Sequence, residues 1–185
     1  MKLTTRMKTR DVAFTFRMGA GFTGDVNRTH PASIEPVLID AASPPLLFGQ
    51  AVLVDPTTQG IRPMVASDVA LTKAYGVTVR AFPTQQSSGT NYGAAPLGSA
   101  VPPTSGVMDA LRAGYIMVQL GNTAWPNAKK GSAVFVWTAA STGTHVQGAF
   151  EDTFSATNTA ALDTNLYTFN GTPDANGVVE LAFNI

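Results

Sequence analysis

Apolar and polar residues alternate at both ends of the chain, and this alternation predicts β-strands. Near the N-terminus, Val12, Phe14, Phe16 and Met18 alternate with Ala13, Thr15 and Arg17. Near the C-terminus, Val179, Leu181, Phe183 and Ile185 alternate with Glu180, Ala182 and Asn184. Because successive side chains of a strand point to opposite faces, each segment has one apolar face. We therefore predict a strand at each end, with the four C-terminal apolar side chains pointing inward.

Between the ends, short apolar runs are separated by Gly, Pro, Asn and Asp, which is typical of strands joined by turns. Predicted strands cover residues 34–39, 50–54, 61–65, 76–82, 115–120, 133–137 and 146–150, with weaker candidates at 161–162 and 166–169. The 50–54 and 61–65 strands are expected to form a hairpin. Pro36 restricts the 34–39 strand to a sheet edge or to an irregular strand, because proline cannot donate to a neighbouring strand. Residues 107–114 are expected to form one or two helical turns that end at Gly114.

Composition supports this β-rich interpretation. Charged residues make up only 13% of the 185 residues, and the chain contains 17 Gly, 12 Pro and no Cys. Runs of Val and Thr broken by Gly and Pro favour short strands and turns. We predict an all-β fold, either a small β-barrel or a β-sandwich, with few or no helices and an extended N-terminal arm. Residues 1–30 would form the basic arm and its hinge, and residues 31–185 the β domain.

The hinge, residues 19–30, contains Gly19, Gly21 and Gly24 at the G-x-G-x-x-G spacing of dinucleotide-binding loops. Such a site needs a helix that starts at the loop, because the helix N-terminus binds the pyrophosphate. Residues 25–30 have no helical apolar spacing, and Pro31 disfavours helix at the preceding residue. We therefore interpret the glycines as turn residues with positive φ. Asp25 and Arg28 would pair within this turn or contact a partner.

Charge is unevenly distributed although the net charge is zero. Residues 1–30 contain six basic and two acidic side chains, whereas residues 131–185 contain five acidic and no basic ones. A basic tail can bind nucleic acid, but sequence-independent binding needs many phosphate contacts, and this tail is short. We favour an arm that lies on an acidic protein surface, such as that of a neighbouring copy. Two interpretations of the 12–18 strand stay open: an edge strand of the main sheet, or a strand added to another chain.

No group of residues predicts catalysis, a metal site or a bound cofactor, so we expect a protein that is not an enzyme. His30 and His145, the two histidines of the sequence, are expected in solvated loops. The adjacent Glu151 and Asp152 would point to opposite faces of a strand, and we expect them to mark a solvated turn. Trp137 continues an apolar strand and is expected in the core, whereas Trp125 is expected in a loop. We expect no membrane span, because no apolar run reaches ~18 residues, and no secretory signal, because residues 1–6 begin no apolar h-region.

Several motifs follow one another in an order that is similar to a known family. They lie at residues 22–28, 34–36, 49–50, 62–63, 79–85, 102–106, 114–118 and 175–185. Over residues 20–185 the chain resembles the structural cement, or capsid decoration, proteins of tailed bacteriophages. The resemblance implies a small β fold, often trimeric, on the outer surface of the virion. Such proteins clamp neighbouring subunits of the shell and have no enzymatic activity.

The resemblance implies two partners, the major capsid protein and further copies of this chain in a homo-oligomer such as a trimer. Synthesis in the host cytoplasm, with no nucleic-acid or membrane partner, is expected. The candidate partner-binding residues are Phe14, Phe16 and Arg17 in the arm and Asp25, Asn27 and Arg28 in the hinge. The alternative function is a head or tail fibre module, or another carbohydrate-binding β module, that uses Trp125 and the 84–106 loop.

Overall fold

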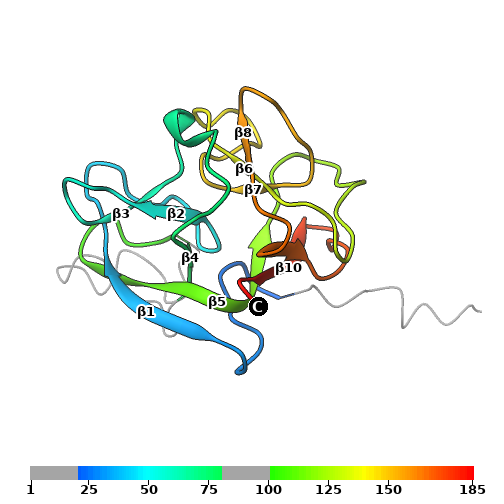
Figure 1. Ribbon diagram of the computed structural model, residues 1–185, viewed down its shortest axis with the longest axis horizontal. Coiled ribbons are helices and arrows are strands. Elements are labelled where there is room, and N and C mark those ends of the chain that lie inside the picture. The colour runs from blue at the N-terminus through cyan, green and yellow to red at the C-terminus, as the bar shows by residue number, and fades with distance from the viewer. Residues whose placement is uncertain (1–20, 81–100) are drawn as a thin grey trace, which may run out of the picture.

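The computed structural model describes residues 21–80 and 101–185, which form ten β-strands and one short 3-10 turn (Figure 1). The strands are β1 (Ser33–Leu38), β2 (Ala51–Val54), β3 (Ile61–Pro63), β4 (Gly76–Thr78), β5 (Val107–Gln119), β6 (Phe135–Trp137), β7 (Phe150–Glu151), β8 (Thr159–Ala161), β9 (Tyr167–Phe169) and β10 (Val178–Phe183). The 3-10 turn is Ala66–Asp68. The all-β prediction is therefore confirmed. The predicted strand at residues 12–18 and most of the 84–106 loop lie outside the described residues.

The strands form two antiparallel sheets that share the main hydrophobic core, and a second, smaller cluster of buried residues includes Val52 and Ile61 of the larger sheet. The larger sheet has the order β3-β2-β4-β5-β10-β9, with β1 also paired to β5, and the smaller sheet has the order β7-β6-β8. In Figure 1 the smaller sheet lies on one side of the molecule, and β1 and β5 run side by side on the other. Both sheets contribute to the main core, with Leu111, Ile116 and Leu181 from the larger and Val136 and Phe150 from the smaller. The fold is therefore sandwich-like and not a closed barrel.

Strand β5 organises the larger sheet because it is long enough to pair with three other strands. Its first half pairs with β1 and β4, and its second half pairs with β10. Strand β1 pairs with β5 alone among the described strands, so the edge position predicted from Pro36 is confirmed. Opposite Arg112 the register of β1 shifts, since Ser33 pairs with Ala113 and Ile34 with Leu111. This bulge bends β5 between its two sets of partners.

The helical turns predicted at residues 107–114 are wrong, because this segment is the first half of β5. Its pairing on both edges outweighs a local apolar spacing that also suited a helix. Gly114 does not end a helix but lies within the strand at φ +139°. A Cβ at this position would lie 2.8 Å from the carbonyl oxygen of Pro31. The glycine is therefore required by a close approach of two backbones.

Two further predictions concern the β2–β3 hairpin and the C-terminal strand. Strands β2 and β3 form the expected antiparallel hairpin, in which Val54 pairs with Ile61. In β10, Val179, Leu181 and Phe183 are buried as predicted. Ile185 is 55% exposed, so its predicted inward orientation is wrong. The strand ends at Phe183, and the alternation cannot continue because Asn184 takes a positive φ of 51°.

The predicted strand at residues 146–150 is wrong over most of its length. Only Phe150 belongs to a strand, β7, and the preceding residues form turns. The amide of Ala149 donates to the carbonyl of Val146, and Gly148 has φ +81°. The carbonyl of Gly148 accepts the amide of Ala51, so this turn is bonded to β2 of the other sheet. A local turn that joins the two sheets has replaced the expected strand.

Candidate functional site

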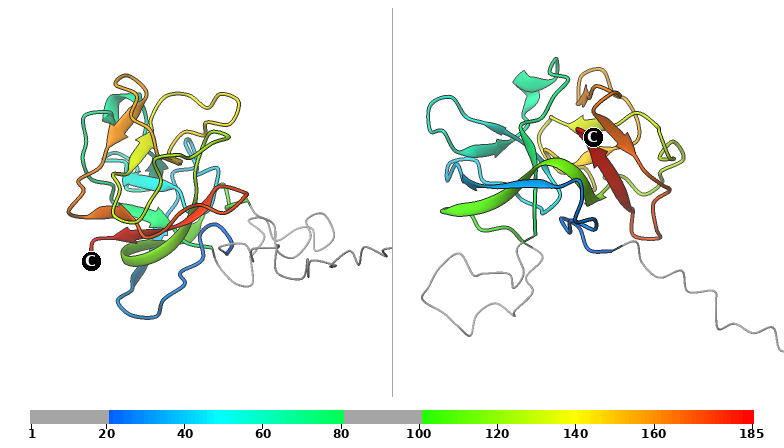
Figure 2. Two further views of the ribbon diagram at one scale, coloured as in Figure 1. Left: turned by 90° about the vertical axis from the view of Figure 1, so that its right-hand side faces the viewer. Right: turned by 60° about the horizontal axis from the view of Figure 1, so that its bottom comes forward.

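The described part of the hinge, residues 21–30, lies along the second half of β5. The amide of Gly24 donates to the carbonyl of Met117 (2.7 Å), and the amide of Met117 donates to the carbonyl of Asp25 (2.9 Å). Val26 forms an isolated bridge to Ile116. In Figure 2 the segment before β1, drawn in blue, lies against β5 and β10. The base of the predicted arm is therefore held by backbone hydrogen bonds to the central strand.

Gly24 meets the expectation of a glycine in a positive-φ turn. Its φ is +86°, and a Cβ there would lie 2.6 Å from the Cβ of Phe48. Gly21 has φ +140° and packs against the side chain of Met117. No helix occurs in residues 21–32, so the described part of the motif lacks the helix that a dinucleotide loop requires. The glycines allow the hinge to pack closely on β5.

The side chains of Asn27 and Arg28 converge on Glu180 of β10. Nη2 of Arg28 lies 2.7 Å from Oε1 of Glu180, and the Nδ2 amide of Asn27 donates to Oε2 of the same carboxylate. Asn170 donates a further hydrogen bond to Oε1. The guanidinium of Arg28 also lies 4.0 Å above the ring centre of Tyr115. The ion pair expected between Asp25 and Arg28 is thus replaced by one between Arg28 and Glu180.

The electrostatics of Glu180 follow from this convergence. Partial burial raises the pKa of its carboxyl group, but the hydrogen bonds from Asn170, Asn27 and Arg28 outweigh burial, so the pKa is lowered overall. Glu180 therefore carries a stable negative charge at neutral pH. Because Arg28 and Asn27 bind this charge, their contacts hold the hinge against β10. Asp25 makes its hinge contacts through its backbone. Its carbonyl accepts the Met117 amide, and its amide donates to the carbonyl of Phe22.

The hinge also brings together two residues that sequence reasoning did not select. Phe22 is 67% exposed, and the guanidinium carbon of Arg80 lies 4.9 Å from its ring centre. The amide of Arg80 donates to the carbonyl of Gly24. Exposed aromatic and Arg side chains are enriched where proteins bind other proteins. An aromatic residue inside a glycine turn was the available signal for Phe22, whereas its contact with Arg80 depends on the fold.

The remaining arm candidates, Phe14, Phe16 and Arg17, lie outside the described residues. Of the six predicted partner-binding residues, the structure therefore places three, Asp25, Asn27 and Arg28, and all three lie in the hinge. Their contacts join the hinge to the β domain. Their predicted contacts with a partner remain a prediction.

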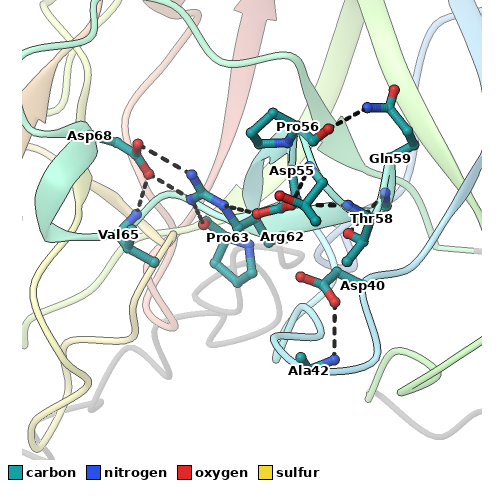
Figure 3. A network of polar contacts seen from close by, with 12 residues as sticks. Asp40, Ala42, Asp55, Pro56, Thr58, Gln59, Arg62, Pro63, Val65 and Asp68 are labelled. Carbon is teal, nitrogen blue, oxygen red and sulfur yellow. Dashed lines mark hydrogen bonds and ion pairs between the residues drawn. The ribbon is translucent and has the colours of Figure 1, made fainter.

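A second polar network surrounds Arg62 on β3 (Figure 3). Arg62 Nη1 lies 2.7 Å from Oδ2 of Asp68, and Nε lies 3.5 Å from Oδ2 of Asp55. Hydrogen bonds from the Thr58 and Thr57 amides and the nearby Arg62 lower the pKa of Asp55. Burial raises the pKa of Asp68, but bonds from Arg62 and the Val65 amide outweigh burial and lower it. This network fixes the β2–β3 turn to the 3-10 turn and is structural.

The expectation that Glu151 and Asp152 mark a solvated turn is wrong, whereas His145 lies in a turn as expected but is only partly solvated, with 28% of its side chain exposed. Glu151 and Asp152 are each only 3% exposed, and Nδ1 of His145 lies 2.8 Å from Oε1 of Glu151. The imidazole stacks on Trp137, with ring centres 4.1 Å apart. Burial raises the pKa of Glu151, although the hydrogen bond from His145 opposes the rise. The Glu151 carboxylate packs against Gly121, and Oδ2 of Asp152 accepts a hydrogen bond from the Asn127 amide. These contacts shield both acidic side chains from solvent.

Trp137 is half-buried and not fully in the core, since its ring lies under His145 and its indole N–H donates to the carbonyl of Ala140. Among residues 21–80 and 101–185, no group of three or more His, Asp or Glu side chains could hold a metal ion. The described residues also contain no helix long and apolar enough to cross a membrane.

Comparison with known proteins gives one decisive match. The model of the XM1 gp53 minor capsid protein family matches residues 12–183, which is nearly the whole chain. The chain belongs to this family. It is therefore a structural component of a phage capsid and of the virion, and it associates with capsid proteins. No curated protein matches the chain. The matched range begins at residue 12, so it includes Phe14, Phe16 and Arg17, which precede the part covered by the resemblance to cement proteins.

Proposed function

We propose that this capsid protein is a non-enzymatic cement, or decoration, protein that binds the outer surface of the phage head. In this proposal it clamps neighbouring major capsid subunits and acts as a homo-oligomer, a trimer by analogy with the proteins it resembles. The observation that carries the proposal is the attachment of the hinge to β5 and β10 in a member of a capsid family. An arm that links neighbouring subunits must be firmly attached at its base to the rest of the protein.

The charge and the apolar pattern of residues 1–30 support a role in binding the shell. Residues 1–30 carry six basic and two acidic side chains, and Arg28 is already paired with Glu180. The other basic residues of the predicted arm, which lie outside the described residues, would complement an acidic shell surface. The alternating residues 12–18 suit addition of a strand to a partner sheet, in which backbone bonds give affinity and alternate side chains give register.

Roles within residues 1–30 can then be divided. Phe14, Phe16 and Arg17 contact the shell or a neighbouring copy, and Asn27 and Arg28 hold the base of the arm on the β domain of residues 31–185. Asp25 continues the backbone bonding to Met117. Phe22 and Arg80 extend the contact surface at the base. Several arms from one oligomer would bind cooperatively, because linked contacts act at effective concentrations near the mM range.

Co-sedimentation with phage heads that lack this chain tests the proposal. We expect the full chain to pellet with the heads, and a deletion of residues 1–18 to stay folded but bind at least about tenfold more weakly, because the linked arm contacts are lost. Phe22→Ala should weaken binding by a smaller factor without changing the unfolding midpoint, since Phe22 is exposed. Leu71→Ala, also at an exposed apolar position, is the matched control. Equal binding of the deletion and the full chain would contradict the role of the arm.

A further inference from the structure

A shallow pocket lies where the end of β5 meets the turn before β10 and the turn before β7. Its volume is about 270 Å³. Polar side chains at its rim come from Gln119, Asn122, Thr144 and Asn176, and Trp125 forms part of its wall. Leu120 and Val146 are among its apolar lining residues. Among the described residues that line it there is no charged side chain, so its chemistry suits a neutral ligand.

Trp125 is held rigidly as one wall of this pocket. Its indole N–H donates to the carbonyl of Gly121 (2.6 Å). One face of the ring packs on Gly177, where a Cβ would lie 2.5 Å from Cζ2, 2.9 Å from Cε2 and 3.0 Å from Cη2 of the indole. Gly177 has φ +77°, so both its conformation and this contact require glycine. Because the ring is fixed before any ligand arrives, little conformational entropy is lost on binding.

Three amide side chains line the pocket together with the indole. Gln119, Asn122 and Asn176 are all exposed, and Nε2 of Gln119 lies 3.3 Å from the carbonyl oxygen of Asn176. Oδ1 of Asn122 accepts the amide of Thr123, which orients its Nδ2 group. Each amide offers both donors and acceptors, as neighbouring sugar hydroxyls require. A flat aromatic wall packs well against the C–H face of a pyranose whose hydroxyls are equatorial.

We propose that this pocket binds a neutral saccharide with glucose-type configuration, which stacks on the face of Trp125 opposite Gly177 and bonds to the three amides. If many copies are displayed on the head, weak binding at each pocket would add up to a high overall avidity. This consequence rests on the proposed function. Saccharide binding by the isolated chain does not depend on that display. The two proposals can therefore fail separately.

The test is a titration of the isolated, isotopically labelled full chain with maltotriose and with chitotriose, followed by NMR. At up to about 10 mM saccharide, we expect saturable shifts of the Trp125 indole N–H and of the Gln119, Asn122 and Asn176 side-chain amides, with a Kd near 1 mM or below, roughly −4 kcal/mol. Gln119→Ala and Asn176→Ala should each weaken binding about threefold to tenfold, as expected for one hydrogen bond. Gln119 and Asn176 are exposed, so their replacement tests binding without disturbing the fold. Trp125→Ala is unsuitable because Trp125 packs against the main core.

Asn165→Ala, at an exposed amide that does not line the pocket, is the matched control and should bind as the wild type does. The proposal is overturned if neither saccharide shifts the Trp125 indole signal. It is equally overturned if shifts occur but persist unchanged in both the Gln119→Ala and Asn176→Ala variants, because binding would then lie elsewhere.

Discussion

Nη2 of Arg28 lies 2.7 Å from Oε1 of Glu180, and this ion pair joins the hinge to strand β10 across 152 positions of sequence. Glu180 is the more buried partner, with 14% of its side chain exposed against 46% for Arg28. The carboxylate also accepts hydrogen bonds from Asn27 and Asn170. One acidic side chain therefore binds both Asn27 and Arg28 of the hinge.

Removing the carboxylate should cost more stability than removing the guanidinium. Glu180→Ala leaves two amide side chains without their acceptor, and we expect a loss of about 1–3 kcal/mol in the free energy of unfolding. Arg28→Ala removes a half-exposed partner and should cost less than about 1 kcal/mol. Urea unfolding measures both values. Lys130→Ala, at an exposed cation outside the hinge, is the control, and equal effects of Glu180→Ala and Lys130→Ala would contradict the anchoring role.

The same carboxylate should make stability depend on pH in the acid range. The pKa of Glu180 is lowered below its ordinary 4.5, so its contribution is fully present above pH 4.5. That contribution is lost as the pH falls through the lowered pKa of the folded state. Wild type and Glu180→Gln should therefore differ most above pH 4.5 and converge below it. A difference in unfolding free energy that stays constant down to the acid limit would contradict this assignment.

Glu151 should show the opposite pH dependence. Burial raises its pKa above 4.5, so the protonated carboxyl is favoured by folding. Its contribution to stability is fully present below pH 4.5 and is lost as the pH rises through the raised pKa. Relative to Glu151→Gln, the wild type should lose stability as the pH rises above 4.5. Thermal unfolding of both proteins at a series of pH values measures the change, and parallel curves would show that Glu151 titrates normally.

Gly114 should tolerate no side chain. Gly114→Ala forces a Cβ into a backbone at φ +139° and to within 2.8 Å of the Pro31 carbonyl oxygen, and we expect a loss of about 1–3 kcal/mol. Gly171→Ala is the matched control, because a Cβ there meets nothing within 4 Å and φ is not in the strained range. Chemical denaturation compares the two. If both substitutions have the same effect, the close approach of β5 and the segment before β1 is not required.

The sequence predicted those elements whose local pattern agrees with their final surroundings. Residues 51–54 and 61–63 form a hairpin because two apolar runs flank a turn, and β10 buries Val179, Leu181 and Phe183 on one face as its alternation requires. Residues 107–114 were mispredicted because strands from distant parts of the chain pair with them on both edges. Tertiary pairing of this kind outweighs local propensity and leaves no short-range signal.

The candidate site was predictable only in part for the same reason. Glycines in the hinge indicated positive-φ turns, and the structure confirms this for Gly21 and Gly24. The acceptor of Arg28, by contrast, lies on the last strand and could not be identified from the turn that contains Arg28. The unequal charge of the two ends predicts a partner surface. At least one of the acidic residues, Glu180, serves the chain itself.

The burial of Glu151 and Asp152 illustrates a further limit. Adjacent acidic residues usually indicate a solvated turn, but here Gly121 and the Asn127 amide cover their two sides. Both groups belong to the segment that follows β5, far from the acidic pair in sequence. Only the packing of the two sheets brings them together.

The measurement that tests the central claim most directly is the thermal rupture of phage heads with and without this chain. Heads that lack the chain are heated with a DNA-binding dye, before and after the purified full chain is added back. If the protein is an outer cement that clamps the shell, the added chain should bind and raise the temperature at which DNA is released, and the chain without residues 1–18 should not. Release at the same temperature despite saturated binding would contradict the account.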